Sequence, residues 1–126
     1  MQIHRVLFVE DSVLLNMENC EFMRGFGYYV AGVYSAPAAL EWLDNNEPLA
    51  ALVTDIDLGN GPDGFDVARH ARMTRPDVPI IFISGSPTAR FSAAQFENAE
   101  FIPKPFYPRQ VTDALARAVG RKAQSA

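Results

Sequence analysis

The sequence predicts an α/β fold, a doubly wound five-stranded parallel sheet with helices on both faces. Two observations support this. Apolar runs of strand length alternate along the chain with segments of helix length that carry helix signals. Three of the runs are apolar at successive positions, which is typical of strands covered by helices on both faces. The 126 residues, 48% of them apolar, suffice for one domain with a sizeable core.

Five apolar runs are predicted to be strands, at residues 6–9, 29–33, 50–53, 80–83 and 100–102. A helix is expected between the first two. Ser12 is its expected N-cap, and it extends to about residue 26. Its expected apolar stripe consists of Leu15, Phe22 and Phe26, and Gly27 lies just past its end.

A second helix is expected after Ser35, its N-cap, because Pro37 would fall in the first turn, where proline is tolerated. A third is expected over residues 64–74 and is stopped by Pro76. The last begins at Pro108, with one apolar face formed by Val111, Leu115 and Ala118. Residues 87–96 contain few strong helix formers, so only a short or mobile helix is expected there.

Charge and composition exclude several classes of protein. Residues 1–66 hold eleven of the fifteen acidic residues, which argues against direct binding of nucleic acid, since that requires a continuous basic face. No segment is apolar for long enough to span a membrane, and the N-terminus has no signal-peptide pattern. The single cysteine, Cys20, cannot form a disulfide within the chain. A cytoplasmic protein is expected.

Polar residues follow four of the five predicted strands. They are Glu10 and Asp11 after the first, Asp55 and Asp57 after the third, Ser84 after the fourth and Lys104 after the fifth. In parallel sheets the functional site lies beyond the carboxyl ends of the strands. We therefore expect these side chains, distant in sequence, to meet at one edge.

The chemistry of these residues indicates phosphoryl transfer. Carboxylates about 4 Å apart repel each other by roughly 4 kcal/mol per pair at an effective dielectric constant near 20. A divalent cation relieves this repulsion, and oxygen ligands of this kind suit Mg²⁺, which keeps waters and leaves room for phosphate oxygens. A lysine ammonium and a serine hydroxyl on the same edge would both favour an incoming phosphoryl group.

Four motifs resemble those of the receiver domain of two-component response regulators. They are residues 9–11 (Val-Glu-Asp), 53–58 (Val-Thr-Asp-Ile-Asp-Leu), 83–85 (Ile-Ser-Gly) and 103–106 (Pro-Lys-Pro-Phe). The resemblance covers about residues 3–120, so we expect a receiver domain over 1–120 and a short tail over 121–126. It implies a flavodoxin-like fold with strand order 2-1-3-4-5.

The resemblance also implies roles for individual residues. Asp55 would be the phosphoacceptor, and the donor would be a sensor histidine kinase or a phosphotransfer protein. Asp11 and Asp55 would bind Mg²⁺ directly, and Asp57 would contribute its backbone carbonyl. Glu10 stands where the family often has aspartate, and its longer side chain would reach the metal through a water molecule.

Three further residues match positions that bind or respond to the phosphoryl group in the family. Ser84 would form a hydrogen bond to it, and Lys104 would form an ion pair with it. The Lys104–Pro105 peptide bond is expected to be cis. Phe101 matches the aromatic switch position, whose ring would turn into the space that Ser84 leaves. Phe101 could equally be an ordinary core residue.

The expected function is that of a phosphoacceptor and not of an enzyme, beyond its own phosphorylation and slow dephosphorylation. We expect no output domain after residue 120, so the message would pass by binding an unknown protein target or by competition for phosphoryl groups. The protein is expected to be a monomer or a weak dimer, with no membrane partner. Two alternatives stay open. Asp55-Ile56-Asp57 resembles the Asp-x-Asp core of haloacid-dehalogenase-type phosphatases, and a pseudo-receiver would bind partners without phosphorylation.

Overall fold

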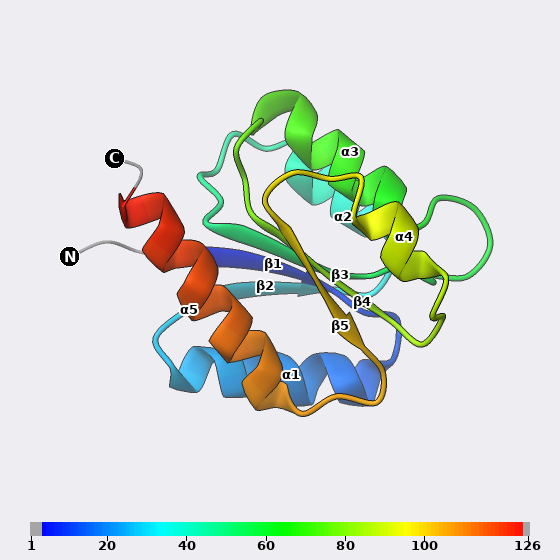
Figure 1. The fold of residues 1–126 in the computed structure, drawn as a ribbon, viewed down its shortest axis with the longest axis horizontal. Coiled ribbons are helices and arrows are strands. Elements are labelled where there is room, and N and C mark those ends of the chain that lie inside the picture. Colours follow the sequence, from blue (N-terminus) through cyan, green and yellow to red (C-terminus); the bar gives the residue numbers. More distant parts are fainter. Residues whose placement is uncertain (1–3, 125–126) are drawn as a thin grey trace.

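The computed structural model describes residues 4–124 and has the predicted architecture, one parallel sheet between two layers of helices (Figure 1). The strands are β1 (Arg5–Val9), β2 (Tyr29–Val33), β3 (Ala51–Asp55), β4 (Ile80–Ser84) and β5 (Ala99–Pro103). The helices are α1 (Val13–Gly25), α2 (Ala36–Leu43), α3 (Gly64–Thr74), α4 (Ala89–Ala93) and α5 (Pro108–Gln124).

The strand order β2-β1-β3-β4-β5 confirms the expected topology, and all neighbouring strands are parallel. Val9 pairs with Thr54, and the next residue of β3, Asp55, pairs with Ile83. The carboxyl ends of the three central strands therefore lie at one edge of the sheet. This register brings the segments that follow β1 and β3 together.

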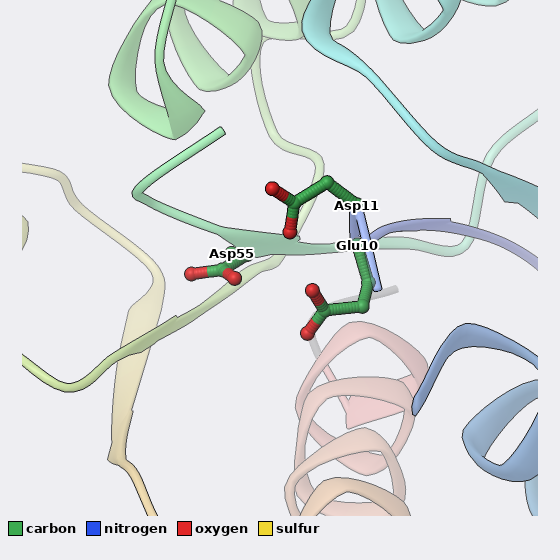
Figure 2. A group of neighbouring side chains, drawn as sticks. All are labelled: Glu10, Asp11 and Asp55. Carbon is green, nitrogen blue, oxygen red and sulfur yellow. The ribbon is translucent and has the colours of Figure 1, made fainter. Parts of the chain in front are cut away.

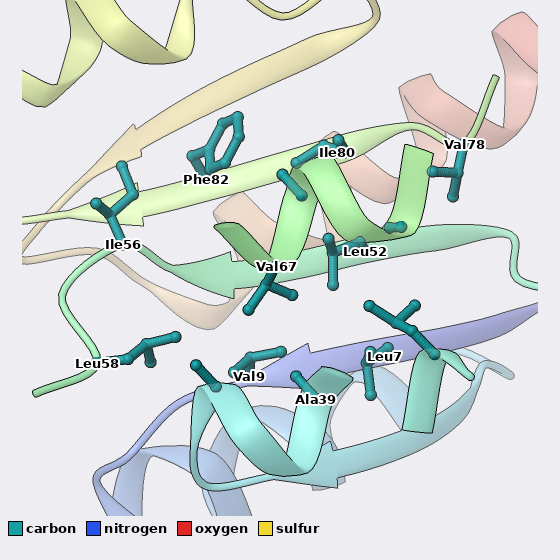
Figure 3. Packing of buried hydrophobic residues seen from close by; sticks show 14 of the residues in the cluster. Leu7, Val9, Ala39, Leu52, Ile56, Leu58, Val67, Val78, Ile80 and Phe82 are labelled. Carbon is teal, nitrogen blue, oxygen red and sulfur yellow. The ribbon is translucent and has the colours of Figure 1, made fainter. Parts of the chain in front are cut away.

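Each face of the sheet has its own apolar core. Helices α1 and α5 cover one face, and α2, α3 and α4 cover the other (Figure 1). Neighbouring strand residues alternate between the two cores, so Leu52 packs beneath α2 and α3 while Val53 packs beneath α1 and α5. The core beneath α2 and α3, shown in Figure 3, includes Phe82, whose ring lies 5.1 Å from those of both Phe65 and Phe96.

The predicted helix boundaries are largely confirmed. The Ser12 hydroxyl caps α1 by accepting a hydrogen bond from the Leu15 N–H, at 3.4 Å, and the Ser35 hydroxyl caps α2 in the same way. Gly27, just past α1, has a φ angle of +94°, a conformation that favours glycine. Helix α4 has only five residues and no side-chain cap, which agrees with the weak helix expected there.

The predicted apolar stripe of α1 is wrong. Leu15 and Phe22 are more than a third exposed and Phe26 is 60% exposed, while the buried face consists of Asn16, Asn19, Cys20 and Met23. The reason is that α1 passes close to the backbone at the end of β2, where short polar side chains fit and Asn16 can donate to the Glu10 and Val33 carbonyls. Glu18 lies on the exposed side of the helix.

Some ends differ from their expected positions. Strand β3 continues through Asp55, so the carboxylate expected just after the strand is its last residue. Helix α5 continues through Gln124, so residues 121–124 of the expected tail are helical, and residues 125–126 lie outside the described part of the chain. The domain boundary at residue 120 stays a prediction. Within residues 4–124, no helix is both long enough and apolar enough to cross a bilayer.

The capping box of α3 provides a test of the fold. The Asp63 carboxylate accepts a hydrogen bond from the Asp66 N–H at 3.0 Å, and the Asp66 carboxylate accepts one from the Asp63 N–H at 2.9 Å. Asp63→Ala removes the cap and is expected to lower the free energy of unfolding by about 1 kcal/mol in urea denaturation. Asn60→Ala, an exposed change in the same loop, is the control. Equal midpoints for the two variants would contradict the assigned role of the cap.

Candidate functional site

Three carboxylates meet at the carboxyl edge of the sheet. Glu10 and Asp11 follow β1, and Asp55 ends the neighbouring strand β3. One oxygen from each carboxylate lies within 4.8 Å of the other two. Figure 2 shows the three side chains grouped around one region between the two segments. The structure thus brings together these three predicted site residues.

The three carboxylates differ in burial. Glu10 is 2% exposed and Asp55 is 3% exposed, whereas Asp11 lies open to solvent. The Oε2 atom of Glu10 accepts a hydrogen bond from the Ser12 N–H at 3.1 Å, so the start of α1 holds this carboxylate. Asp55 and Glu10 therefore form the floor of the site and Asp11 forms its rim.

Lys104 completes the cluster from the end of β5. Its Nζ atom lies 2.7 Å from Oδ2 of Asp55 and 3.6 Å from Oε1 of Glu10. The backbone N–H of Lys104 donates to the carbonyl of Ser84 at 2.9 Å, and the Lys104–Pro105 peptide bond is cis, as expected. A single ammonium thus contacts both buried carboxylates.

Burial dominates the electrostatics of the site. Desolvation, together with Asp11 and Asp55, raises the pKa of Glu10 to about 7, although the Ser12 N–H opposes this shift. Burial also raises the pKa of Asp55, against the stabilising effect of Lys104. Burial disfavours the charged form of Lys104, but Asp55 and Glu10 outweigh it and raise the pKa of this amine. One ammonium does not compensate for two buried carboxylates.

The donor set fits a divalent cation. Oδ1 of Asp55 is buried and has no hydrogen-bond partner among the described residues, although a buried carboxylate oxygen normally has one. A hard cation with oxygen ligands would satisfy this atom and reduce the repulsion among the three carboxylates. The same three residues are the group of acidic side chains close enough to hold a metal ion in residues 4–124.

The side chain of Ser84 is not joined to this cluster. Ser84 is buried at the end of β4, but its hydroxyl accepts a hydrogen bond from the Ser86 N–H at 3.0 Å. The Ser86 hydroxyl in turn lies 3.1 Å from that of Thr88. The loop after β4 thus holds the Ser84 hydroxyl, a contact that no pattern in the sequence predicts. The predicted role of Ser84 stays a prediction.

Phe101 and Asp57 lie outside the carboxylate cluster. Phe101, on β5, packs against the core beneath α2 and α3, and the guanidinium of Arg90 lies 4.7 Å from the centre of its ring. The side chain of Asp57 is exposed, and its backbone N–H helps to lower the pKa of Asp55. The roles predicted for the Phe101 ring and the Asp57 carbonyl stay predictions.

Gly64, which the sequence predicts only as the start of a helix, also shapes the site. A Cβ atom at this position would lie 2.3 Å from the carbonyl oxygen of Asp55 and 2.7 Å from the Cα of Ile56. The Gly64 N–H also donates to the Ile56 carbonyl at 2.8 Å. Only glycine lets α3 start this close to the strand that carries Asp55.

Comparison with known proteins shows which family this chain resembles. Residues 6–116 match the family described as the response regulator receiver domain. The phyllosphere-induced regulator PhyR of Methylorubrum extorquens is 29% identical over 115 residues, which cover 90% of this chain and 43% of PhyR. The sensor protein TorS of Escherichia coli is 33% identical over 114 residues, 88% of this chain and 12% of TorS. This chain thus spans less than half of either relative.

Other relatives match over nearly their full length. The response regulator receiver protein CpdR of Brucella abortus is 28% identical over 90% of this chain and 94% of its own. A solved response regulator receiver protein from Sinorhizobium medicae has a TM-score of 0.87 at 28% identity, covering 94% of this chain and 96% of that one. A CheY-like receiver from Methanospirillum hungatei, at 22% identity, has the same TM-score and shows the fold alone.

The raised pKa of Glu10 predicts how stability depends on pH in metal-free buffer. Between pH 4.5 and about 7 the folded protein keeps the Glu10 proton that the unfolded chain releases, so the folded state binds more protons. The free energy of unfolding of the wild type should therefore fall over this range relative to that of Glu10→Gln. Urea denaturation of both proteins at several pH values measures this difference in the free energy of unfolding.

Glu18→Gln, at an exposed position of α1, is the matched control and should follow the wild type. The prediction is wrong if the free energies of unfolding of Glu10→Gln and the wild type change by the same amount between pH 4.5 and 7.

Proposed function

Because the chain belongs to the response regulator receiver domain family, we propose that Asp55 is its phosphoacceptor in two-component signalling. Receiver domains are generally signalling modules without enzymatic turnover. The observation that carries the proposal is the position of Asp55, the last residue of β3, between two further carboxylates and the Lys104 ammonium. These four residues combine a nucleophile, a cation site and a positive charge for a phosphoryl group.

Asp55, Asp11 and the backbone carbonyl of Asp57 would hold Mg²⁺, and Glu10 would act through a bound water molecule. Receiver domains bind Mg²⁺ at such an acidic pocket, and the unpartnered Oδ1 of Asp55 supports its placement here. When bound, the ion supplies positive charge that neutralises phosphoryl oxygens and offsets the carboxylate repulsion.

In the transfer step, a carboxylate oxygen of Asp55 attacks the phosphorus atom of the donor. An O–P bond forms, and the bond from phosphorus to the leaving atom breaks with its electron pair going to the leaving group. With a phosphohistidine donor the broken bond is P–N, and the ring, protonated on its other nitrogen, leaves as neutral imidazole. The product is an acyl phosphate on Asp55.

Lys104 has two roles in this proposal. Before transfer it contacts Asp55 and favours its ionised, nucleophilic form, against the effect of burial. During transfer the negative charge moves from the carboxylate to the phosphoryl oxygens. The Lys104 side chain, 30% exposed and flexible, can follow that charge and form an ion pair with the new group.

The proposed switch is a change of partner for Ser84. The Ser84 hydroxyl now accepts a hydrogen bond from the Ser86 N–H, and we propose that it turns away from this N–H to donate to a phosphoryl oxygen. The loop before α4 then loses one of its internal hydrogen bonds. The Phe101 ring, now beneath Arg90, would turn into the space that Ser84 vacates, and α4 would repack.

The partners on either side of this reaction are also proposed. A sensor histidine kinase or phosphotransfer protein would supply the phosphoryl group, and an unknown protein would read the altered surface. The two alternative functions have less support. Asp55-Ile56-Asp57 ends the third strand and not the first, which is unlike the phosphatase core. Asp55 and Lys104 lie in contact, which a pseudo-receiver would not require.

Phosphorylation by a small donor tests the central proposal. Incubation with acetyl phosphate and Mg²⁺ should add one phosphoryl group to Asp55, detected by mass spectrometry of the intact protein and its peptides. Asp55→Asn removes the nucleophile and should abolish labelling, and a chelator should slow it strongly. Asp57→Asn is the matched control, since it keeps the backbone carbonyl and should still be labelled.

Labelling of Asp55→Asn to the wild-type extent would overturn the assignment of the phosphoacceptor. Continuous release of phosphate without a labelled protein would instead favour the phosphatase reading.

The switch has a separate test. The Ser84→Ala variant should still be phosphorylated on Asp55, but it lacks the hydroxyl that would donate to the phosphoryl group. The shifts of the Phe101 and Arg90 backbone amides that phosphorylation causes in NMR spectra should therefore be much smaller than in the wild type. Ser86→Ala keeps the backbone N–H and serves as the control. Wild-type shifts in Ser84→Ala would exclude Ser84 as the link.

A further inference from the structure

Asn16 is a buried polar residue that the proposed reaction does not use. It lies in the first turns of α1 and is 2% exposed. Its Nδ2 amide donates to the Glu10 carbonyl at 3.0 Å and to the Val33 carbonyl at 2.9 Å. Both hydrogens of one amide group are therefore used on two carbonyls from different strand ends.

These two carbonyls fix the backbone of the acidic segment. Val33 is the last residue of β2, and its carbonyl also accepts the Glu10 N–H at 3.1 Å. Asn16 thus ties the peptide group between Glu10 and Asp11 to the end of the neighbouring strand. Both side chains of the acid pair leave the backbone on either side of this peptide, so its orientation sets where their carboxylates lie.

The amide oxygen of Asn16 is held as well. The Cys20 thiol, one turn further along α1, donates to Oδ1 at 3.3 Å. Gly32 leaves space for both groups, since a Cβ there would lie 2.5 Å from Oδ1 of Asn16 and 2.7 Å from Sγ of Cys20. The Asn16 side chain is therefore closely packed, and both of its polar atoms form hydrogen bonds.

We propose that Asn16 is a positioning residue for the cation site, holding the Glu10–Asp11 backbone in the conformation that gathers the carboxylates. The inference rests on the proposed function, since it concerns the same site. Asn16 touches neither the cation nor the phosphoryl group. It acts through the backbone of the residues that do, much as the groups behind metal ligands orient them elsewhere.

Two asparagines on the same buried helix face allow a matched test. Asn16→Ala removes the bonds to Glu10 and Val33. Asn19→Ala removes an equally buried amide that donates to Leu15 within α1 and lies outside the acidic segment. Titration with Mg²⁺ by calorimetry, under conditions where circular dichroism shows both variants folded, should give about tenfold weaker binding for Asn16→Ala and wild-type binding for Asn19→Ala.

A readout without metal separates positioning from general loosening. In the metal-free protein, Asn16→Ala should speed hydrogen exchange of the Glu10 amide by about fivefold relative to that of Phe8 in the strand interior. Asn19→Ala should leave this ratio unchanged. Gly32→Ala keeps Asn16 but places a methyl group where its amide oxygen lies, so it should change binding and exchange in the same direction.

Equal Mg²⁺ affinity in Asn16→Ala and the wild type would overturn the inference, as would equal weakening in Asn16→Ala and Asn19→Ala. If Asn16→Ala does not fold, Gly32→Ala decides, and wild-type binding by that variant counts against the inference. Failure of the wild type to bind Mg²⁺ would overturn the proposed function instead. The exchange rates of the metal-free proteins would then still decide whether Asn16 holds the loop.

Discussion

The mutual repulsion of three carboxylates at one edge of the sheet is the constraint on which the site depends. Two of them, Glu10 and Asp55, are almost completely buried, where each charge is costly unless it is compensated. Lys104 contacts both but supplies a single positive charge. Burial raises the pKa of both carboxyl groups, and the neighbouring carboxylates add to this shift. A site with this excess of negative charge is suited to take up a cation and then a phosphoryl group that the cation and Lys104 can neutralise.

The fold provides this arrangement through the order of its strands. Because β1 and β3 are neighbours, the residues at their carboxyl ends meet although more than 40 positions separate them in sequence. The parallel direction of every strand places Lys104 at the same edge. Local contacts then refine the positions. Ser12 holds the Glu10 carboxylate from the start of α1, and Gly64 lets α3 begin against the backbone of Asp55.

Much of this could be predicted from the sequence, since strand-length apolar runs and the residues after them follow simple periodic rules. The alternation of strands and helices, the caps at Ser12 and Ser35 and the meeting of Glu10, Asp11, Asp55 and Lys104 are all in the structure. The buried face of α1 could not be predicted, because it depends on contacts with the Glu10 and Val33 carbonyls, which come together only in the folded sheet. The hydrogen bond of the Ser84 hydroxyl depends likewise on the conformation of the following loop.

The close packing at Gly64 makes the contacts on the two sides of the strand that carries Asp55 unequal. On the α3 side, the Gly64 N–H donates to the Ile56 carbonyl, and there is no space for a Cβ atom at Gly64. The reciprocal Asp63–Asp66 hydrogen bonds also hold the start of α3. On the far side of β4, a five-residue helix without a side-chain cap gives a compliant edge. If Asp55 is phosphorylated as proposed, we therefore expect the resulting displacement to be larger toward α4 than toward α3.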